Sequence, residues 1–459
     1  MDYSTLVRHA PLWLALLAIL IYASGLGGGF VYDDEQILVE SPHVVTAGLR
    51  QAFISDFWGF PPRGWRSQHY RPLSMLAYAG VYRVAGLSPF AFHAADILLH
   101  AAAVIAFYFL VAGLGFGAKR TGARAASGNN RGNAAQVGSG RAPLFAFPQD
   151  IATAAALLFA VHPLHVEAVA WMTGMTETLA GAAVLGSLAL FVRGRRGPSL
   201  GLAAAALLSK ETALVLPALV FLLASPRGRW KAAWPHALLA AGYLAARAVI
   251  LPGPPWGALL KSLLGGGLHM PAVAAHYVRA LWVPWPLAVH YELPGMWSLA
   301  AAAALLVALG WWCRKDRRMA LAAGLALFPL VIPVVTSALM QEFLKIQDRY
   351  AYLATAGACL AAALLLARLP GRGLLYGCLL LVSLGALATN RQIGVWQDNE
   401  TLWTHTLVVT PSSKPAALNL GYTLYLEKRF REAARVYREA LVYHPGDGEL
   451  TRCLSLVQR

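Results

Sequence analysis

Residues 11–35 read PLWLALLAILIYASGLGGGFVYDDE, an apolar run that ends in three adjacent carboxylates, Asp33, Asp34 and Glu35. A helix needs about 20 apolar residues to cross a membrane, and this run has that length. Ionised carboxylates at a membrane boundary are costly and usually have a function. The stretch therefore predicts a first span over 12–29, retained as a signal anchor, with an acidic motif at its outer end.

The composition extends this prediction to most of the chain. Of the 459 residues, 58% are hydrophobic and 13% are charged, whereas about a quarter of the residues of soluble proteins are charged. Apolar runs of similar length recur, which favours spanning helices over a barrel. We expect an all-α polytopic membrane protein with eleven spans, at 12–29, 90–113, 149–165, 173–192, 198–209, 212–224, 233–251, 297–313, 319–338, 350–367 and 373–389.

The net charge of +16 follows the expected topology. With the N-terminus and Arg8 in the cytoplasm, the inner segments carry more Lys and Arg than the outer ones, as the positive-inside rule requires. No nucleic-acid partner is therefore expected. The segment 117–143 is a low-complexity cytoplasmic loop that cannot bury a core. The acidic motif and everything after residue 390 face outward.

Two outer segments of the membrane domain, 1–390, do not have the pattern of spans. The segment 30–89 has amphipathic patches at 44–54 and 73–84 and many aromatic residues, which is typical of helices that lie in the membrane interface. The segment 252–296 combines Pro and Trp residues and is expected to be interfacial or re-entrant.

The tail, 391–459, has a soluble composition and a readable period. Pro411 and Pro445 are 34 residues apart, which is the tetratricopeptide spacing. About three repeats are needed for an independent core. A tail with roughly one and a half is therefore expected to pack against the membrane domain or a partner, and a lone helical hairpin is the alternative. The residues at signature positions are Leu420, Gly421, Leu424, Ala433, Tyr437 and Ala440.

Polar residues of the outer side gather in a few short motifs. Together they supply what the transfer of a sugar from a lipid phosphate to a hydroxyl requires, namely a carboxylate that takes a proton and cations that stabilise the departing phosphate. The tight ligand spacing of a metal site is missing, so no metal is expected, although the histidines near Glu167 leave a divalent ion open. The residues are His69, Arg71, His165, Glu167, Glu177, Lys210, Glu211, Asp348 and Arg349.

The ordered motifs resemble a known family. They are FVYDD (30–34), YRPL (70–73), FHAADILLH (92–100), HPLHVEAVAW (162–171), LSKETA (208–213) and DRYAYL (348–353), followed by the tail. In this order they are similar to the transmembrane tetratricopeptide-repeat O-mannosyltransferases, which belong to the GT-C superfamily with the protein O-mannosyltransferases. The tail is much shorter than the repeat arrays of the animal members, which leaves the acceptor open.

The resemblance implies an inverting transfer from a polyprenyl-phosphate sugar, with an aspartate of the first outer loop as general base. Asp34 is the first candidate and Asp33 the second, with Glu35 matching the acid that follows in related enzymes. The candidates for binding the donor phosphate are Arg71, Lys210 and Arg349. The residues expected to shape the substrate site are His69, His165, Glu167, Glu177, Glu211 and Asp348.

Each assignment has an alternative. The aspartates could cap the helix that follows, Arg71 could anchor the loop, and Lys210 with Glu211 could be a structural ion pair. The whole protein could instead be a membrane-anchored tetratricopeptide scaffold or a transporter of lipid-linked sugars. Composition and the short tail suggest a bacterial inner membrane, with the tail in the periplasm. The sugar, the acceptor, the tail's partner and the oligomeric state stay open.

Overall fold

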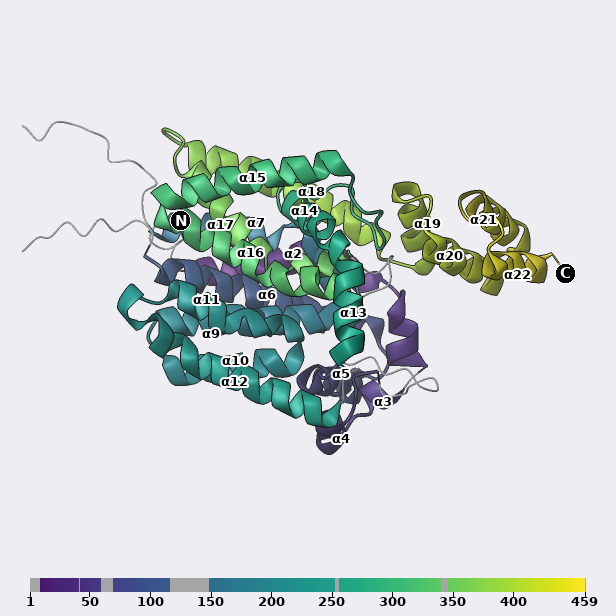
Figure 1. The fold of residues 1–459 in the computed structure, drawn as a ribbon, viewed down its shortest axis with the longest axis horizontal. Helices are drawn as coiled ribbons and strands as arrows, with labels where there is room; N and C mark the ends of the chain where they lie inside the picture. The colour runs from purple at the N-terminus through teal and green to yellow at the C-terminus, as the bar shows by residue number, and fades with distance from the viewer. Residues whose placement is uncertain are drawn as a thin grey trace, which may run out of the picture.

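Among the residues that this computed structural model describes, five helices are long and apolar enough to cross a membrane, and the chain is therefore a membrane protein. The structure describes residues 9–40, 42–58, 69–115, 148–251, 256–339 and 346–458, and every regular element in these ranges is helical (Figure 1). Arg8 and the loop 117–143 lie outside the described residues. The five helices are Ala10–Gly27, Pro89–Gly113, Met172–Val192, Arg317–Ser337 and Gly373–Val395.

Each of the eleven predicted spans coincides with one helix or with two consecutive ones. The count of eleven stays a prediction, because several of these helices are short or carry charges. The main helices are α2 (Ala10–Tyr22), α6 (Pro89–Gly113), α7 (Pro148–Ala160), α8 (Val166–Val169), α9 (Met175–Val192), α10 (Arg196–Ser209), α11 (Leu216–Leu223), α12 (Arg229–Ile250), α15 (Met296–Lys315), α16 (Arg317–Ser337), α17 (Thr355–Leu366) and α18 (Gly373–Val395).

One predicted span, 149–165, is broken in the structure. Helix α7 ends at Ala160, and the axis bends by 52° before the segment Pro163–Val169. A residue that precedes proline is driven out of the helical conformation, and His162 has ψ 123°. The break places the polar part of the HPLHVEAVAW motif at the end of the bundle rather than inside a continuous helix.

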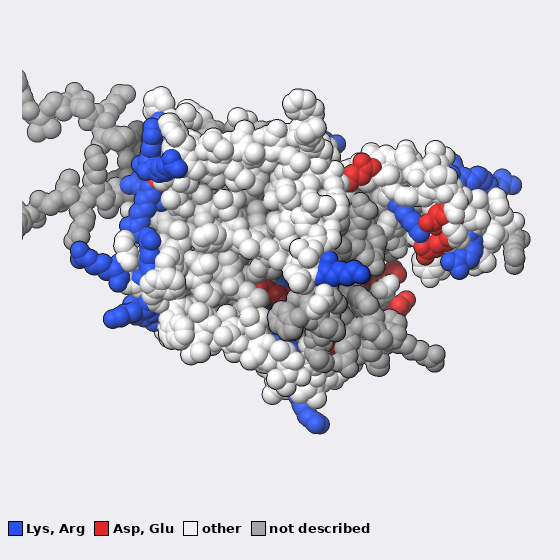
Figure 2. Space-filling model, viewed as in Figure 1, with Lys and Arg blue, Asp and Glu red and all other residues white. Residues whose placement is uncertain are grey.

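The described basic residues assigned to the cytoplasm lie in the turns, or in the adjoining helix ends, that join α9 to α10, α11 to α12, α15 to α16 and α17 to α18. Figure 2 shows Lys and Arg side chains in a column at one end of the bundle, on the left, and the tail at the other end. The tail and these basic ends, called the basic turns below, are therefore at opposite ends of the bundle. Which end faces the cytoplasm stays a prediction.

Short helices cover the end of the bundle that faces the tail. They include the predicted amphipathic segments, as α3 (Pro42–Val45), α4 (Leu49–Ile54) and α5 (Pro72–Ala85). Helix α13 (Trp256–Gly266) runs across the direction of the bundle helices and is followed by α14 (Met270–Ala280) (Figure 1). That these segments lie in the membrane interface stays a prediction.

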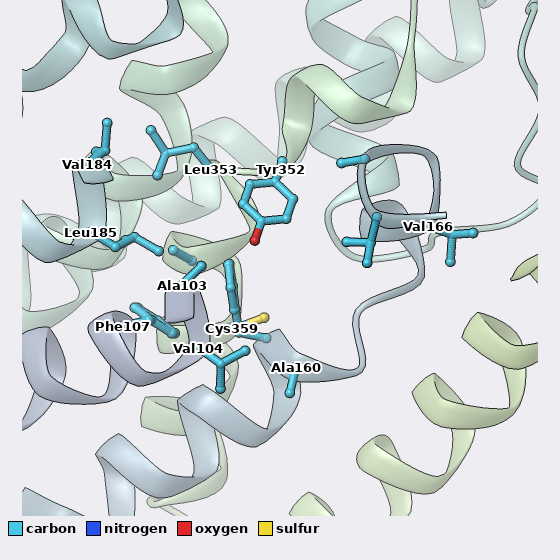
Figure 3. Packing of buried hydrophobic residues seen from close by; sticks show 14 of the residues in the cluster. Ala103, Val104, Phe107, Ala160, Val166, Val184, Leu185, Tyr352, Leu353 and Cys359 are labelled. Atoms are coloured by element: carbon cyan, nitrogen blue, oxygen red, sulfur yellow. The ribbon is translucent and has the colours of Figure 1, made fainter. Parts of the chain in front are cut away.

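Helices α6, α9 and α17 form the centre of the bundle. Apolar side chains from these helices, including Phe107, Leu185 and Cys359, belong to one buried cluster with Tyr352, which precedes α17 (Figure 3). A small residue brings α17 close to α16, because a Cβ at Gly357 would stand 2.1 Å from the backbone nitrogen of Ala326. Close backbone approach of this kind is how helices pack in membranes without a hydrophobic driving force.

The tail consists of four helices, α19 (Asn399–Val409), α20 (Lys414–Leu426), α21 (Phe430–Tyr443) and α22 (Gly448–Val457). Helices α20 and α21 pair as a hairpin, and every signature position from Leu420 to Ala440 is buried. Helix α19 packs against α20 on one side and reaches the membrane domain on the other. The tail is thus docked, as its small size predicts.

Replacing Gly421 by Ala should destabilise this hairpin. A Cβ at Gly421 would stand 2.3 Å from the ring of Tyr437, so the two helices must separate or the ring must move. Overpacking of this kind costs about 1–3 kcal/mol. Hydrogen exchange of the amides in 414–443 should become faster in the full chain. Gly448→Ala is the control, since nothing lies within 4 Å of a Cβ there; equal exchange in both variants would contradict the close packing.

Candidate active site

Asp34 ties the first outer loop to the start of α9. Its Oδ1 accepts hydrogen bonds from the backbone N–H of Thr173, at 2.8 Å, and from the Thr173 hydroxyl. Its Oδ2 accepts from the backbone N–H of Val31 at 3.2 Å. The side chain is fully buried. Both oxygens of Asp34 are therefore engaged by donors that hold the loop in place.

Asp33 is in a different state. It is half-buried, and it makes no hydrogen bond or ion pair with any residue that the structure describes. Burial raises the pKa of Asp33 to about 6, and the nearby Arg349 opposes this rise. Burial also raises the pKa of Asp34 to about 7, against its three hydrogen bonds. The acidic pair thus contains one carboxylate fixed by donors and one that is free to accept a proton.

Glu35, the third acid of the motif, is exposed. It begins a π-helical turn, Glu35–Val39, and its Oε1 accepts from Asn399 at 3.2 Å. The residue that precedes the acidic pair, Tyr32, has φ 57°, which is uncommon for a residue other than glycine. The loop is therefore held in a conformation that the chain alone would not favour.

The three predicted phosphate-binding cations gather around Tyr350. The Lys210 ammonium lies 5.2 Å and the Arg349 guanidinium 5.1 Å from the centre of the Tyr350 ring. Arg71 is close enough to act on both Lys210 and Tyr350 electrostatically. Burial lowers the pKa of Lys210 to about 8, and the two arginines add to this while Glu177 opposes it. The three cations form one group, as predicted.

Each cation also has a carboxylate partner. Arg71 donates from Nε and Nη2 to Glu211 at 3.0 and 2.9 Å, with His69 beside them. Burial would raise the pKa of Glu211, but Arg71 and His69 hold it well below its usual value. Two further predicted residues complete the set: Glu177 pairs with Lys210, and Glu167 pairs with the side chain of Arg349 and accepts from its backbone N–H at 3.0 Å.

The pairs leave donors unused. A guanidinium has five N–H groups and an ammonium has three. Among the residues that the structure describes, side-chain hydrogen bonds occupy only Nη1 of Arg349 and one N–H of Lys210. The Arg349 guanidinium also lies 4.6 Å from the centre of the Trp171 ring. The carboxylates therefore orient the cations without saturating them, so the group can still bind an anion.

Two predicted residues have other hydrogen-bond partners. The imidazole of His165 bonds the hydroxyl of Thr355 at 2.6 Å and packs against Phe159 and Tyr352 inside the bundle. Asp348 accepts from the hydroxyl of Tyr291 at 2.5 Å, and so links the DRYAYL motif to the segment before α15. No described contact joins either residue to Asp33.

Sequence reasoning missed several residues of the site. Three of them lie within or next to the quoted motifs, namely Trp171, Thr173 and Tyr350. Their proximity to the motifs could have indicated that they belong to the site. Asn399 carries no such signal, because it belongs to the tail. Within the described part of the chain, no group of three His, Cys, Asp or Glu side chains could hold a metal ion.

Comparisons with known proteins agree with the motifs. A protein O-mannosyl-transferase of Caenorhabditis elegans is 27% identical over 462 residues, which cover 94% of this chain and 62% of the relative. The chain resembles the protein O-mannosyl-transferases. A human one is 33% identical over 36% of this chain and 16% of its own length, and one from Drosophila melanogaster is 31% identical over 46% and 22%.

The resemblance expected from the motifs is thereby confirmed. The chain spans less than two thirds of the length of each of these three relatives. No family model matches the chain, and no solved structure matches it.

Proposed function

We propose that the chain is a membrane glycosyltransferase that moves a sugar from a polyprenyl-phosphate donor to a hydroxyl of a protein, lipid or glycan acceptor. The names of its relatives make mannose the first sugar to test and protein the first acceptor. The observation that carries the proposal is Asp33, a half-buried carboxylate that has no hydrogen bond or ion pair among the described residues and on which Arg349 acts electrostatically.

Asp33 is the better candidate for the base. A general base must offer a lone pair to the acceptor hydroxyl. Asp34 is fully buried, and donors of Thr173 and Val31 take three of the roughly four lone-pair sites of its carboxylate. In the proposed step Asp33 takes the hydroxyl proton while the acceptor oxygen attacks the anomeric carbon. The bond between that carbon and the phosphate oxygen breaks, the configuration inverts, and polyprenyl phosphate leaves.

The cations stabilise the phosphate that leaves. Negative charge develops on the leaving oxygen, and donors fixed in advance in a site with little water lower the barrier most. Arg349, Lys210 and Arg71 are fixed in this way by their carboxylates. The active site lies on the outer side in this proposal, because the tail contacts the acidic loop and is opposite the basic turns. A bacterial inner membrane remains our proposal for the location.

The donor class can be tested directly. The full chain in proteoliposomes should transfer mannose from polyprenyl-phosphate mannose to a peptide or glycan acceptor, and should not use GDP-mannose. Transfer from the nucleotide sugar alone would overturn the proposal. Mass spectrometry of envelope proteins and glycolipids with and without the gene would identify the sugar and the acceptor together.

The transfer rate should depend on pH through Asp33. The carboxylate must be ionised to accept a proton, and burial raises its pKa to about 6. The rate should therefore be highest near pH 7 and should fall about tenfold for each pH unit below 6. It should fall again above pH 8, as Lys210, whose pKa burial lowers to about 8, loses its charge. Rates measured from pH 4.5 to 8.5, with thermal unfolding recorded at each pH as the control, check this. A rate that is unchanged down to pH 4.5 would contradict a base of raised pKa.

A further inference from the structure

The first helix of the tail binds the acidic loop on both sides of the aspartate pair. Asn399, at the start of α19, accepts the backbone N–H of Tyr32 on its Oδ1 at 2.9 Å. Its Nδ2 donates to Oε1 of Glu35 at 3.2 Å. Tyr32 and Glu35 are the residues that flank Asp33 and Asp34 in the sequence. One amide side chain from the tail therefore holds both ends of the acidic pair.

Other contacts support this attachment. The backbone N–H of Gly29 donates to the carbonyl of Gln397 at 2.9 Å. The ring of Tyr32 packs between those of Trp171 and Trp403, with ring centres 5.4 and 5.3 Å apart. Trp403 lies on α19 and is almost completely buried. The tail is thus in contact with the loop along several residues rather than at one point.

The conformation of the loop depends on such contacts. Tyr32 has φ 57°, and a strained residue of this kind persists only where its surroundings fix it. The ring of Trp171 contacts the ring of Tyr32 and also the guanidinium of Arg349. Holding Tyr32 therefore holds the direction of Asp33 relative to the cation group. A displacement of about 1 Å in such a constellation can cost a hundredfold in rate.

We infer that Asn399 is a positioning residue for the transfer reaction, and that α19 is a part of the active site rather than only the first element of a binding tail. The inference rests on the proposed function, because it assigns Asn399 to the loop that carries the base. Asn399 does not touch the reacting atoms in this view. It acts by fixing the backbone at Tyr32 and the side chain of Glu35.

One variant and a matched control test the inference. Asn399→Ala removes both hydrogen bonds. Asn419→Ala is the control, because Asn419 is also a half-buried tail residue but its Nδ2 bonds within its own helix, to the carbonyl of Pro415. Thermal unfolding of the full chain in detergent shows whether each variant is folded.

The expected result is a loss of turnover without a loss of donor binding. Asn399→Ala should lower kcat roughly ten- to hundredfold with an unchanged KM for the lipid donor. Asn419→Ala should behave as wild type. Hydrogen exchange of the amides in 29–35 should become faster in Asn399→Ala only.

The pH profile separates positioning from general loss of structure. Arg349, from the segment before α17, acts electrostatically on Asp33 and is itself paired with Glu167. Asp34 and Tyr32, from the same loop, also interact electrostatically with Asp33. A loosened loop admits water to Asp33, so its pKa should return toward the ordinary value. The acidic limb of the rate profile should then move to lower pH in Asn399→Ala.

Two outcomes would overturn the inference. The first is wild-type kcat and wild-type exchange of residues 29–35 in Asn399→Ala. The second is faster exchange with wild-type kcat, which would make the contact structural. If the wild-type protein transfers no sugar from any polyprenyl-phosphate donor, the proposed function fails and the catalytic role of Asn399 fails with it. The exchange rates still decide in that case whether the tail fixes the loop.

Discussion

Asp33→Asn should abolish most of the transfer activity. The amide has the size of the carboxylate but cannot take a proton, and loss of a positioned general base lowers a rate by about 10²–10⁴-fold. The KM for the lipid donor should hardly change, because a base contributes to the transition state more than to ground-state binding. Initial rates with polyprenyl-phosphate mannose over a range of donor concentrations measure both quantities.

Asp34→Asn should behave differently. The introduced amide can still accept from Thr173 but would turn a donor toward the N–H of Val31. A buried donor without a partner costs about 1–3 kcal/mol, so the main effect should be a lower melting temperature. The fall in rate should be smaller than that of Asp33→Asn.

Glu40→Gln is the matched control for these two variants, because Glu40 is an exposed acid of the same segment. It should change neither rate nor stability. A larger loss of rate in Asp34→Asn than in Asp33→Asn, at equal folding, would return the role of base to Asp34.

Much of the fold could be predicted because the bilayer sets the length of the apolar runs and the placement of Lys and Arg. Neither depends on how the side chains pack in the folded protein. The helices at 90–113 and 173–192 appear almost at their predicted ends. The break in the helix at Ala160 was harder to predict from the sequence. Pro163 signals it, yet the run around it is apolar enough to be taken for one span.

The site could be predicted only as a group. The motifs identify Arg71, Lys210 and Arg349, and the structure brings them together. The sequence does not tell which neighbour of a carboxylate donates to it. The difference between Asp33 and Asp34 arises from the N–H groups of Thr173 and Val31, whose positions depend on packing. The contact of Asn399 with the loop is equally invisible, since 364 residues separate it from Glu35.

The second large effect is expected at the buried pair of Arg349 and Glu167. Their side chains are only 10% and 3% exposed. Removing one partner of a buried ion pair leaves an uncompensated charge and costs about 3–5 kcal/mol. Arg349→Met and Glu167→Gln should therefore each lower the melting temperature strongly. The exposed pair of Arg435 and Glu439 is the control, and Arg435→Met should leave the melting temperature unchanged.

The double variant Arg349→Met/Glu167→Gln separates folding from function. It buries no unpaired charge, so much of the lost stability should return, as it does when buried ion pairs are replaced by neutral groups. Activity should not return, because the proposed phosphate site lacks Arg349 and Asp33 loses its nearby cation. A double variant that recovers both stability and transfer would show that the pair serves the fold alone. One that recovers stability with a raised KM and a lowered kcat would place Arg349 at the donor phosphate, since that charge is felt in binding and more strongly as the phosphate leaves.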